Sequence, residues 1–520
     1  MALTTNHYDL VVIGQDVAGL VAAALVARRN KRVLVMPHGS AEGSVRLGGQ
    51  LLPLDTAPVA HMATAPVQRV FQELGLWQQI RRDQGLVEGM VHWVLAGQRL
   101  DVQPPDGRLL EETAREWPDD PVAEAWSLRD RWTHATDELL DQLLTSDNAL
   151  VADGFWSRRF LSRVASQLPA RDVDELQPLP PEHPLRAVSR AVEPWLQHLS
   201  PTQLGKAASL RLAGLWARGP NDVPRGMPHI RKTLLQRIEL HSGEVKPDLR
   251  VAELQIRRGR VVGLSLLGKR DRYGCDHVIV AMDPRRLLSG MLPPEHVPKP
   301  LATTVQAIVP VAYRFVMHAE LDERGLSPGL AGTAVCLPAP KHPITPGDSG
   351  ELQSRATWAA HGVGHTYLRV RPGAREGQRR LSITRIVAPG EDMVTLRERI
   401  LDELDLRGVL PFCHDHLSLL HSPHDGREAT DGRGRVRADL GSGTAMQHPM
   451  DPIYAIQGEP SLGVGVMPYG SGIKNLHLAG RLTLPGLGLE GEFTAGTMAA
   501  GLVVAPAKSP FSRSPLLSKA

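Results

Sequence analysis

The stretch Tyr8–Met36, YDLVVIGQDVAGLVAAALVARRNKRVLVM, decides the fold of this chain. Within it, Tyr8–Ile13 joins β-branched and apolar residues without alternation, which is typical of a strand buried on both faces of a parallel sheet. Leu20–Arg29 is dense in Ala and Leu and predicts a helix packed under that sheet. Lys31–Met36 predicts a second strand. The order strand, turn, helix and strand indicates a Rossmann-type unit.

The turn Gly14–Gly19 holds two of the three glycines of a dinucleotide-binding turn. Gly14 permits the tight turn, and Gly19 lets helix and strand pack closely. In such a turn a pyrophosphate approaches backbone N–H groups at the helix N-terminus, where the macrodipole favours negative charge. We therefore expect the unit to bind the ADP half of FAD. The candidate cofactor residues of this turn are Gly14, Asp16, Val17, Ala18 and Gly19.

Two positions depart from the dinucleotide pattern. Asp16 stands at the middle glycine position, where it adds bulk and negative charge next to the expected phosphate. Pro37 stands after the second strand, where an acidic side chain would accept hydrogen bonds from a ribose hydroxyl. A plain tight turn of an α/β protein is therefore the alternative interpretation of this motif.

A second Gly-rich strand-to-helix turn lies near the other end of the chain. Ile473–Arg481 predicts a buried strand, and Gly486, Gly488 and Gly491 follow before a predicted helix. Glycines there allow backbone to lie against a flat ligand, with a helix N-terminus aimed at it. Such a helix end stabilises the negative charge of a reduced flavin. Two turns of this kind in one chain are more specific than either alone.

With two further segments, these turns resemble the phytoene desaturase family of the FAD-dependent amine oxidase-like superfamily nearly end to end. In Gly48–Leu76, Asp55 matches the family's strand ending in Asp-x-Gly, while Ala57 replaces its glycine. The other segment starts at Pro224-Arg225-Gly226-Met227 and closes on residues 276–284, DHVIVAMDP.

The resemblance implies an α/β fold with a Rossmann-type FAD-binding domain and a second α+β substrate domain, built from an antiparallel sheet and helices. The expected FAD-binding domain is discontinuous and comprises residues 1–76, 210–290 and 445–505. The substrate domain would comprise residues 77–209 and 291–444, and residues 506–520 a flexible tail.

The resemblance also implies further cofactor residues. Val245 would touch the adenine side of FAD, and Pro37 lies at the ribose position. The remaining candidates are Gly480, Arg481, Gly488, Leu489 and Glu490. Arg481 stands at a position that is often acidic in the family. Glu490 either stabilises the helix through the macrodipole or lies beside the flavin or substrate and tunes it.

Composition limits the other classes of function. The 520 residues are enough for two or more domains. A formal net charge of +3 from 59 basic and 56 acidic residues is too balanced for a nucleic-acid-binding protein, and leaves a weak attraction to anionic membranes. The three cysteines, Cys275, Cys336 and Cys413, have no metal or redox spacing and fit a reducing compartment.

We expect a cytoplasmic protein, with peripheral membrane contact left open, because neither a signal peptide nor a run of about 18 apolar residues is readable. The cluster Cys413-His414-Asp415-His416 is assigned to the sheet of the substrate domain, and no metal is expected. Aromatic residues form only 4% of the chain, which favours an apolar tunnel over an aromatic cage for an amine.

The first functional hypothesis is an FAD-dependent oxidoreductase whose flavin accepts a hydride from an apolar small molecule, a polyene or an isoprenoid. No catalytic residue stands out. The second is a cofactor-free, lipid-binding or scaffold protein with the same fold, as in Rab GDP-dissociation inhibitors, which the departures at Asp16, Pro37, Ala57 and Arg481 favour. An amine oxidase is a third alternative, and a protein partner stays open.

Overall fold

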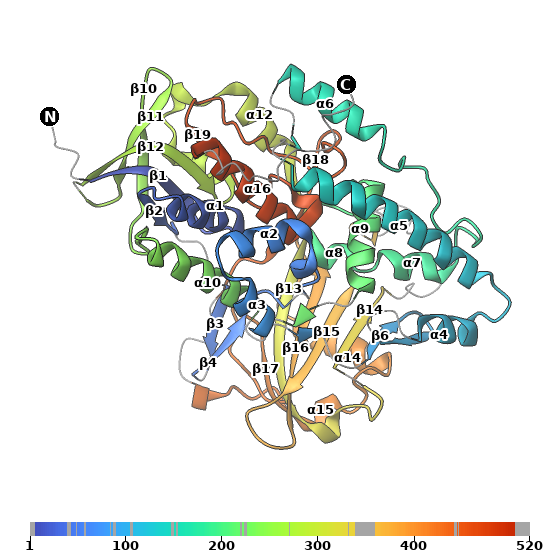
Figure 1. Ribbon diagram of the computed structural model, residues 1–520. Helices are drawn as coiled ribbons and strands as arrows, with labels where there is room; N and C mark the ends of the chain where they lie inside the picture. Colours follow the sequence, from blue (N-terminus) through green and yellow to red (C-terminus); the bar gives the residue numbers. More distant parts are fainter. Residues whose placement is uncertain are drawn as a thin grey trace, which may run out of the picture.

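The computed structural model describes most of the chain and shows two sheets with helices packed around them (Figure 1). The described residues are 6–38, 43–47, 49–56, 59–83, 85–86, 90–103, 108–146, 150–151, 154–218, 221–222, 226–269, 271–330, 332–338, 359–440, 445 and 447–504. Gly48, Ala57, Pro224, Arg225 and the predicted tail 506–520 lie outside them.

The first sheet is built around β1 (Asn6–Gly14), which pairs in parallel with β2 (Val33–Met36) on one side and β12 (Arg272–Ala281) on the other. The strand order is β10-β11-β12-β1-β2-β9, and β19 also pairs with β12. The other strands are β9 (Glu244–Val245), β10 (Val251–Arg257), β11 (Arg260–Leu266) and β19 (Leu476–Leu478). The apolar run of β1 is buried on both faces, as is typical of a parallel sheet that is covered on both sides.

Helix α1 (Val17–Arg28) lies between this sheet and the C-terminal helix α16 (Gly488–Val503), as Figure 1 shows. All its residues from Val17 to Ala27 are buried. A Cβ on Gly19 would lie 2.1 Å from Ala281 Cβ, so this glycine lets α1 approach β12. Helices α2 (Ala65–Glu73) and α10 (Gly226–Leu240) complete this layer.

The second sheet has the order β17-β13-β16-β15-β14-β6-β7, with β18 also paired to β13. Its strands are β6 (Val91–Val94), β7 (Arg99–Val102), β13 (Ile308–Asp322), β14 (Thr333–Cys336), β15 (Thr366–Pro372), β16 (Gln378–Val387), β17 (Leu417–His421) and β18 (Asp451–Ile456). All its pairings are antiparallel except that of β14 with β6.

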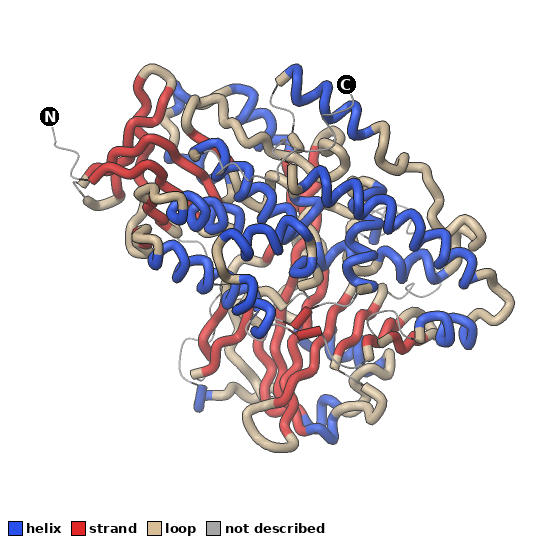
Figure 2. Tube along the Cα trace, in the orientation of Figure 1, coloured by secondary structure: helices blue, strands red, loops and turns tan. Residues whose placement is uncertain are grey.

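Helices cover one flank of the second sheet (Figure 2). The longest is α5 (Val122–Leu144), which packs on α9 (Lys206–Ala217). The remaining elements are α3 (Trp77–Asp83), α4 (Leu109–Glu116), α6 (Phe155–Ala165), α7 (Pro184–Arg190), α8 (Glu193–Leu196), α11 (Pro284–Arg286), α12 (Lys299–Ala307), α14 (Leu396–Leu406), α15 (Cys413–His416), and the strand pairs β3 (Ser44–Leu47) with β4 (Gln50–Pro53) and β5 (Gly85–Leu86) with β8 (Asn221–Asp222).

The predicted fold class is confirmed: a parallel Rossmann-type sheet is joined to a second, largely antiparallel sheet with helices. The domain boundaries stay a prediction. One local assignment is corrected, because Cys413–His416 forms the helical turn α15 and strand β17 begins only at Leu417. Among the described residues, no helix is long and apolar enough to cross a bilayer. In that same part of the chain, no three His, Cys, Asp or Glu side chains are grouped to hold a metal ion.

Candidate functional site

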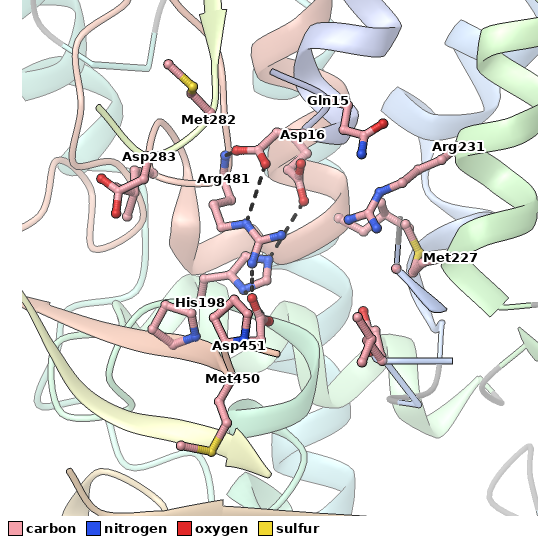
Figure 3. A pocket seen from close by; sticks show the side chains of 18 of the residues that line it. Gln15, Asp16, His198, Met227, Arg231, Met282, Asp283, Met450, Asp451 and Arg481 are labelled. Carbon is pink, nitrogen blue, oxygen red and sulfur yellow. Dashed lines mark hydrogen bonds and ion pairs between the residues drawn. The ribbon is translucent and has the colours of Figure 1, made fainter. Parts of the chain in front are cut away.

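A cavity of about 360 Å³ lies where the carboxyl ends of β1 and β12 face the second sheet (Figure 3). Its lining includes Asp16 after β1, Met282 after β12, Arg481 after β19 and Asp451 at the start of β18. The crevice at the carboxyl ends of parallel strands is where open α/β sheets bind ligands. We therefore take this cavity as the candidate functional site.

The first Gly-rich turn is shaped by its packing against β12. Gly14 has φ +105°, and a Cβ there would lie 2.1 Å from the carbonyl oxygen of Ala281. The backbone N–H of Asp16 donates to the same oxygen at 3.0 Å. Helix α1 then begins at Val17, with Asp16 as an N-cap residue whose side chain makes no capping hydrogen bond. The glycine requirement therefore follows from protein contacts alone.

The Asp16 side chain instead bridges the two Gly-rich turns. Its Oδ2 accepts the backbone N–H of Arg481 at 3.2 Å, and its Oδ1 lies 3.9 Å from Arg481 Nε (Figure 3). A Cβ on Gly480 would lie 2.8 Å from this carboxylate. Burial raises the pKa of Asp16, and the charge of Arg481 opposes that rise. Asp16 and Arg481 are thus partners.

The bridge continues into the second sheet as a row of alternating charges. The guanidinium of Arg481 contacts the Asp451 carboxylate, whose Oδ2 accepts from Arg314 Nη1 at 2.7 Å. Burial lowers the pKa of Arg314 to about 10. His198 lies 3.8 Å from both Asp451 and Glu492, and burial lowers its pKa well below the usual value. The charges that face the cavity are therefore largely paired with one another.

Glu490 points away from the cavity and into a buried ion pair. Its Oε1 lies 2.6 Å from Nη2 of Arg211 on α9, and its Oε2 accepts from Nε at 3.2 Å. Arg211 also contacts Asp137 at 3.0 Å and Asp141 at 2.5 Å. Burial raises the pKa of Glu490 and Arg211 opposes it. The residue anchors α16, while Leu489 and Glu492 on the same helix line the cavity.

The three glycines of the second turn are also accounted for by protein packing. A Cβ on Gly488 would lie 1.9 Å from the carbonyl oxygen of Leu196. A Cβ on Gly491 would lie 2.2 Å from that of Leu484, and one on Gly486 would lie 2.8 Å from Val464 Cα. The absence of side chains at these positions therefore does not by itself indicate a flat ligand.

Of the candidate cofactor residues, Asp16, Arg481 and Leu489 line the cavity. Val245 pairs with Val35 beside the end of β2, and neither Val245 nor Pro37 belongs to the lining. The others are buried in the surrounding framework: Gly14, Val17, Ala18, Gly19, Gly480, Gly488 and Glu490.

Five buried polar atoms that have no hydrogen-bond partner among the described residues belong to side chains that line the cavity from separate segments. They are His61 Nε2, Trp195 Nε1, Arg231 Nε, His424 Nε2 and Glu492 Oε2. The residues His61, Trp195, His424 and Glu492 are at most 5% exposed. Because buried polar atoms in proteins almost always have partners, this convergence indicates a cavity built around a polar occupant.

The protonation states of the two cavity histidines, His61 and His424, determine which hydrogen-bond donors and acceptors they present. His424 Nδ1 lies 2.9 Å from the carbonyl oxygen of His448, so Nδ1 carries the proton and Nε2 presents a lone pair. Burial lowers the pKa of His424 to about 4 and that of His61 to about 3. Both rings are neutral at pH 7. With the donors of Trp195 and Arg231, the cavity offers both donors and acceptors.

Sequence reasoning missed most of this polar set. His61, Trp195 and Arg231 stand in no motif, and only the fold brings them together. His424 follows the histidine cluster at Cys413–His416, and Glu492 lies in the first turn of the helix after the second Gly-rich turn, but neither position belongs to a motif of its own. Asp55, matched through the family resemblance, does line the cavity, together with the sequence candidates Asp16, Arg481 and Leu489.

The residues present do not fit FAD laid along the two turns. The pyrophosphate would meet the Asp16 carboxylate at the point where a dinucleotide turn needs bare backbone. Pro37 has no side-chain acceptor for the ribose, and Arg481 is engaged by two carboxylates. The space beside Gly486, Gly488 and Gly491 is filled by protein atoms.

Solved structures with the same fold include oxidases of amines. A putrescine oxidase double mutant from a redesign of cofactor binding has a TM-score of 0.55 at 13% identity, over 96% of this chain and 100% of that one. Cyclohexylamine oxidase from Brevibacterium oxydans IH-35A has a TM-score of 0.51 at 16% identity, over 95% and 98%. A Pyrococcus furiosus protein has a TM-score of 0.52 at 13% identity, over 96% and 99%.

Likeness at this identity concerns the fold: the chain has the flavoprotein oxidoreductase fold of the amine oxidases. The narrower resemblance to phytoene desaturases stays a prediction. A comparison with models of known protein families finds no match. A comparison with curated protein sequences finds none either.

Proposed function

We propose that this chain uses the flavoprotein oxidoreductase fold to bind a small polar ligand directly in the cavity between its two sheets, without FAD. The observation that carries the proposal is the convergence of five unpartnered buried polar atoms on that cavity. Of the three hypotheses that the sequence left open, it keeps the cofactor-free binding protein but replaces the expected lipid with a polar ligand. The Asp16–Arg481 bridge supports it, because the bridge joins the two turns that FAD would have to span.

The donor and acceptor set argues for the class of ligand. Arg231 and Trp195 can only donate, whereas Glu492 Oε2 and His424 Nε2 can accept. A ligand with an acceptor group at one end and a hydroxyl or ammonium at the other would satisfy all four. An apolar polyene would leave them unpaired, at about 1–3 kcal/mol for each buried group. The lining therefore favours a polar ligand over the apolar substrate expected from composition.

Native mass spectrometry and an absorption spectrum of the purified chain test the proposal. We expect no flavin absorption bands, no thermal shift with added FAD, and a small adduct that is lost on denaturation. Glu492→Gln and Trp195→Phe should each lower occupancy about tenfold, the effect of losing roughly 1.4 kcal/mol of binding.

His241→Gln is the matched control, because its Nε2 is also buried and unpartnered but lies outside the cavity. This variant should keep full occupancy. A yellow protein that releases FAD on denaturation would contradict the proposal, and so would an adduct that both cavity variants retain.

An FAD-dependent oxidoreductase, the first hypothesis from the sequence, is the second candidate. Arg231 supports it, because its positive charge acts on Asp16 at the start of α1 and both residues line the cavity (Figure 3). A cation there would suit a phosphate. In that case the charged lining favours a polar substrate, such as an amine, over a polyene. Saturable quenching of FAD fluorescence on titration with the protein would support this candidate over the first.

A further inference from the structure

Helix α6 (Phe155–Ala165) carries an aromatic pair on the protein surface. Phe155 is 61% exposed and Trp156 76% exposed, and their rings meet edge to face with centroids 5.3 Å apart. On the opposite side of the helix, Leu161 and Val164 are buried. Figure 1 places α6 at the outer edge of the molecule. Two large aromatic side chains side by side in solvent are unusual for a protein surface.

Arginines share the outward side of α6 with the aromatic pair. Arg158, Arg159 and Arg163 are all exposed, and the stretch 154–171 contains no acidic residue. None of the three arginines forms an ion pair with a residue that the structure describes. The spacing of Phe155, Arg159 and Arg163 at intervals of four places them along one helix face. The outward face is therefore both apolar and positively charged.

We propose that α6 docks on an anionic membrane surface. Helices that lie in the membrane interface combine Trp and Phe on the inserted side with Arg or Lys that pair with lipid phosphates. The partner is assigned from charge complementarity, since no acidic residue that the structure describes pairs with the exposed arginines of α6. A nucleic-acid partner fits less well, because the chain as a whole has 59 basic and 56 acidic residues and no general basic surplus. This inference does not depend on what the cavity binds.

The two aromatic rings and the arginines have separable roles in this docking. Trp156 and Phe155 would sit at the level of the lipid headgroups, where amphipathic rings partition favourably. The arginines would supply attraction that depends on anionic lipid and falls with salt. Binding should therefore need both anionic lipid and the aromatic pair.

Co-sedimentation of the full chain with vesicles tests the proposal. We expect binding to phosphatidylcholine vesicles that contain phosphatidylserine, little binding to phosphatidylcholine alone, and weakening as salt rises. Arg159→Ala and Arg163→Ala should each lower the partition coefficient about fivefold. Trp156→Ala should lower it by a similar factor without changing the charge of the protein.

Leu406→Ala and Arg433→Ala are the matched controls, since Leu406 is 86% exposed and Arg433 is exposed, both outside α6. Both should bind as the parent protein does, and circular dichroism should show all variants folded. Equal sedimentation with and without phosphatidylserine would overturn the proposal. Equal loss in the control variants would also overturn it, as would displacement from neutral and anionic vesicles alike by a single-stranded oligonucleotide.

Discussion

The carboxylate of Glu490 and the guanidinium of Arg211 illustrate how single residues hold this fold together. Both side chains are at most 2% exposed, and two hydrogen bonds join them across α16 and α9. Removing one partner of a buried ion pair costs about 3–5 kcal/mol when the remaining charge has no other partner, and loss of Glu490 would leave Arg211 with the more exposed Asp137 and Asp141. Glu490 is therefore a stabilising residue of the framework.

Glu490→Gln should lower the free energy of unfolding by about 3 kcal/mol, because Arg211 would lose its only fully buried anion. Urea denaturation followed by circular dichroism measures the change. Asp141→Asn is the matched control, since it removes a second anion on the same guanidinium whose side chain is 42% exposed. It should cost less than about 1 kcal/mol. An equal decrease in the free energy of unfolding in both variants would show that burial of the Glu490–Arg211 pair does not determine its contribution to stability.

The sequence shows where this chain departs from the family pattern, but it does not show that two of these departures contact each other. Asp16 and Arg481 were both readable as departures from the family pattern. Their pairing was not, because 465 positions separate them and no local rule joins positions that far apart. In the structure the two unusual residues contact each other, which explains why the chain carries both departures together.

Among the elements, helix α16 shows how tightly the second Gly-rich turn is enclosed. Gly488 has φ +52°, and a Cβ on it would lie 1.9 Å from the carbonyl oxygen of Leu196, the last residue of α8. Any side chain there would displace backbone, and no rotamer can relieve the overlap. This close approach fixes where α16 begins.

Gly488→Ala should destabilise the protein by more than about 2 kcal/mol, because both the space and the left-handed backbone exclude a Cβ. Gly501→Ala in the same helix is the control: no atom lies within 4 Å of its Cβ position. Helix propensity predicts that this change stabilises by up to about 1 kcal/mol. Thermal unfolding of the two variants separates the effects. A Gly488→Ala variant as stable as the parent protein would show that the Cβ position is not blocked by backbone.

The sequence predicted the existence of the elements better than their ends. The first strand and helix were expected at Tyr8–Ile13 and Leu20–Arg29 and occur at Asn6–Gly14 and Val17–Arg28. The helix starts earlier because only Gln15 and Asp16 form the turn. At the other end, α16 takes in Gly488–Gly491, which periodicity alone assigned to a loop. Packing against Leu196 and Leu484 overrides the low helix propensity of glycine there.

Across the whole molecule, buried neutral histidines are a recurring feature. Burial lowers the pKa of His61 and His318 to about 3, and that of His365, His424 and His477 to about 4. An unfolded histidine binds its proton near pH 6.5. Between that pH and the folded pKa, the unfolded state therefore holds more protons than the folded state.

Stability should consequently fall as the pH is lowered from about 6.5 toward 4, by up to about 1.4 kcal/mol per pH unit for each such histidine. Urea midpoints measured between neutral and mildly acid pH check this. His318→Gln should flatten the dependence, whereas His7→Gln should not, because the His7 side chain is 57% exposed. A pH profile that is flat over this range would be incompatible with these buried rings.

The contact between Asp16 and Arg481 joins two segments that are far apart in the sequence, which matters for folding during translation. Strand β1 and helix α1 are translated before their neighbours in the fold, β12 and α16, which lie more than 250 and 450 positions further along the chain. At typical rates of synthesis the apolar faces of α1 wait roughly 25–100 s for α16 to arrive. During that interval the apolar residues of α1 lack the helix that covers them in the folded protein, which exposes the nascent unit to aggregation.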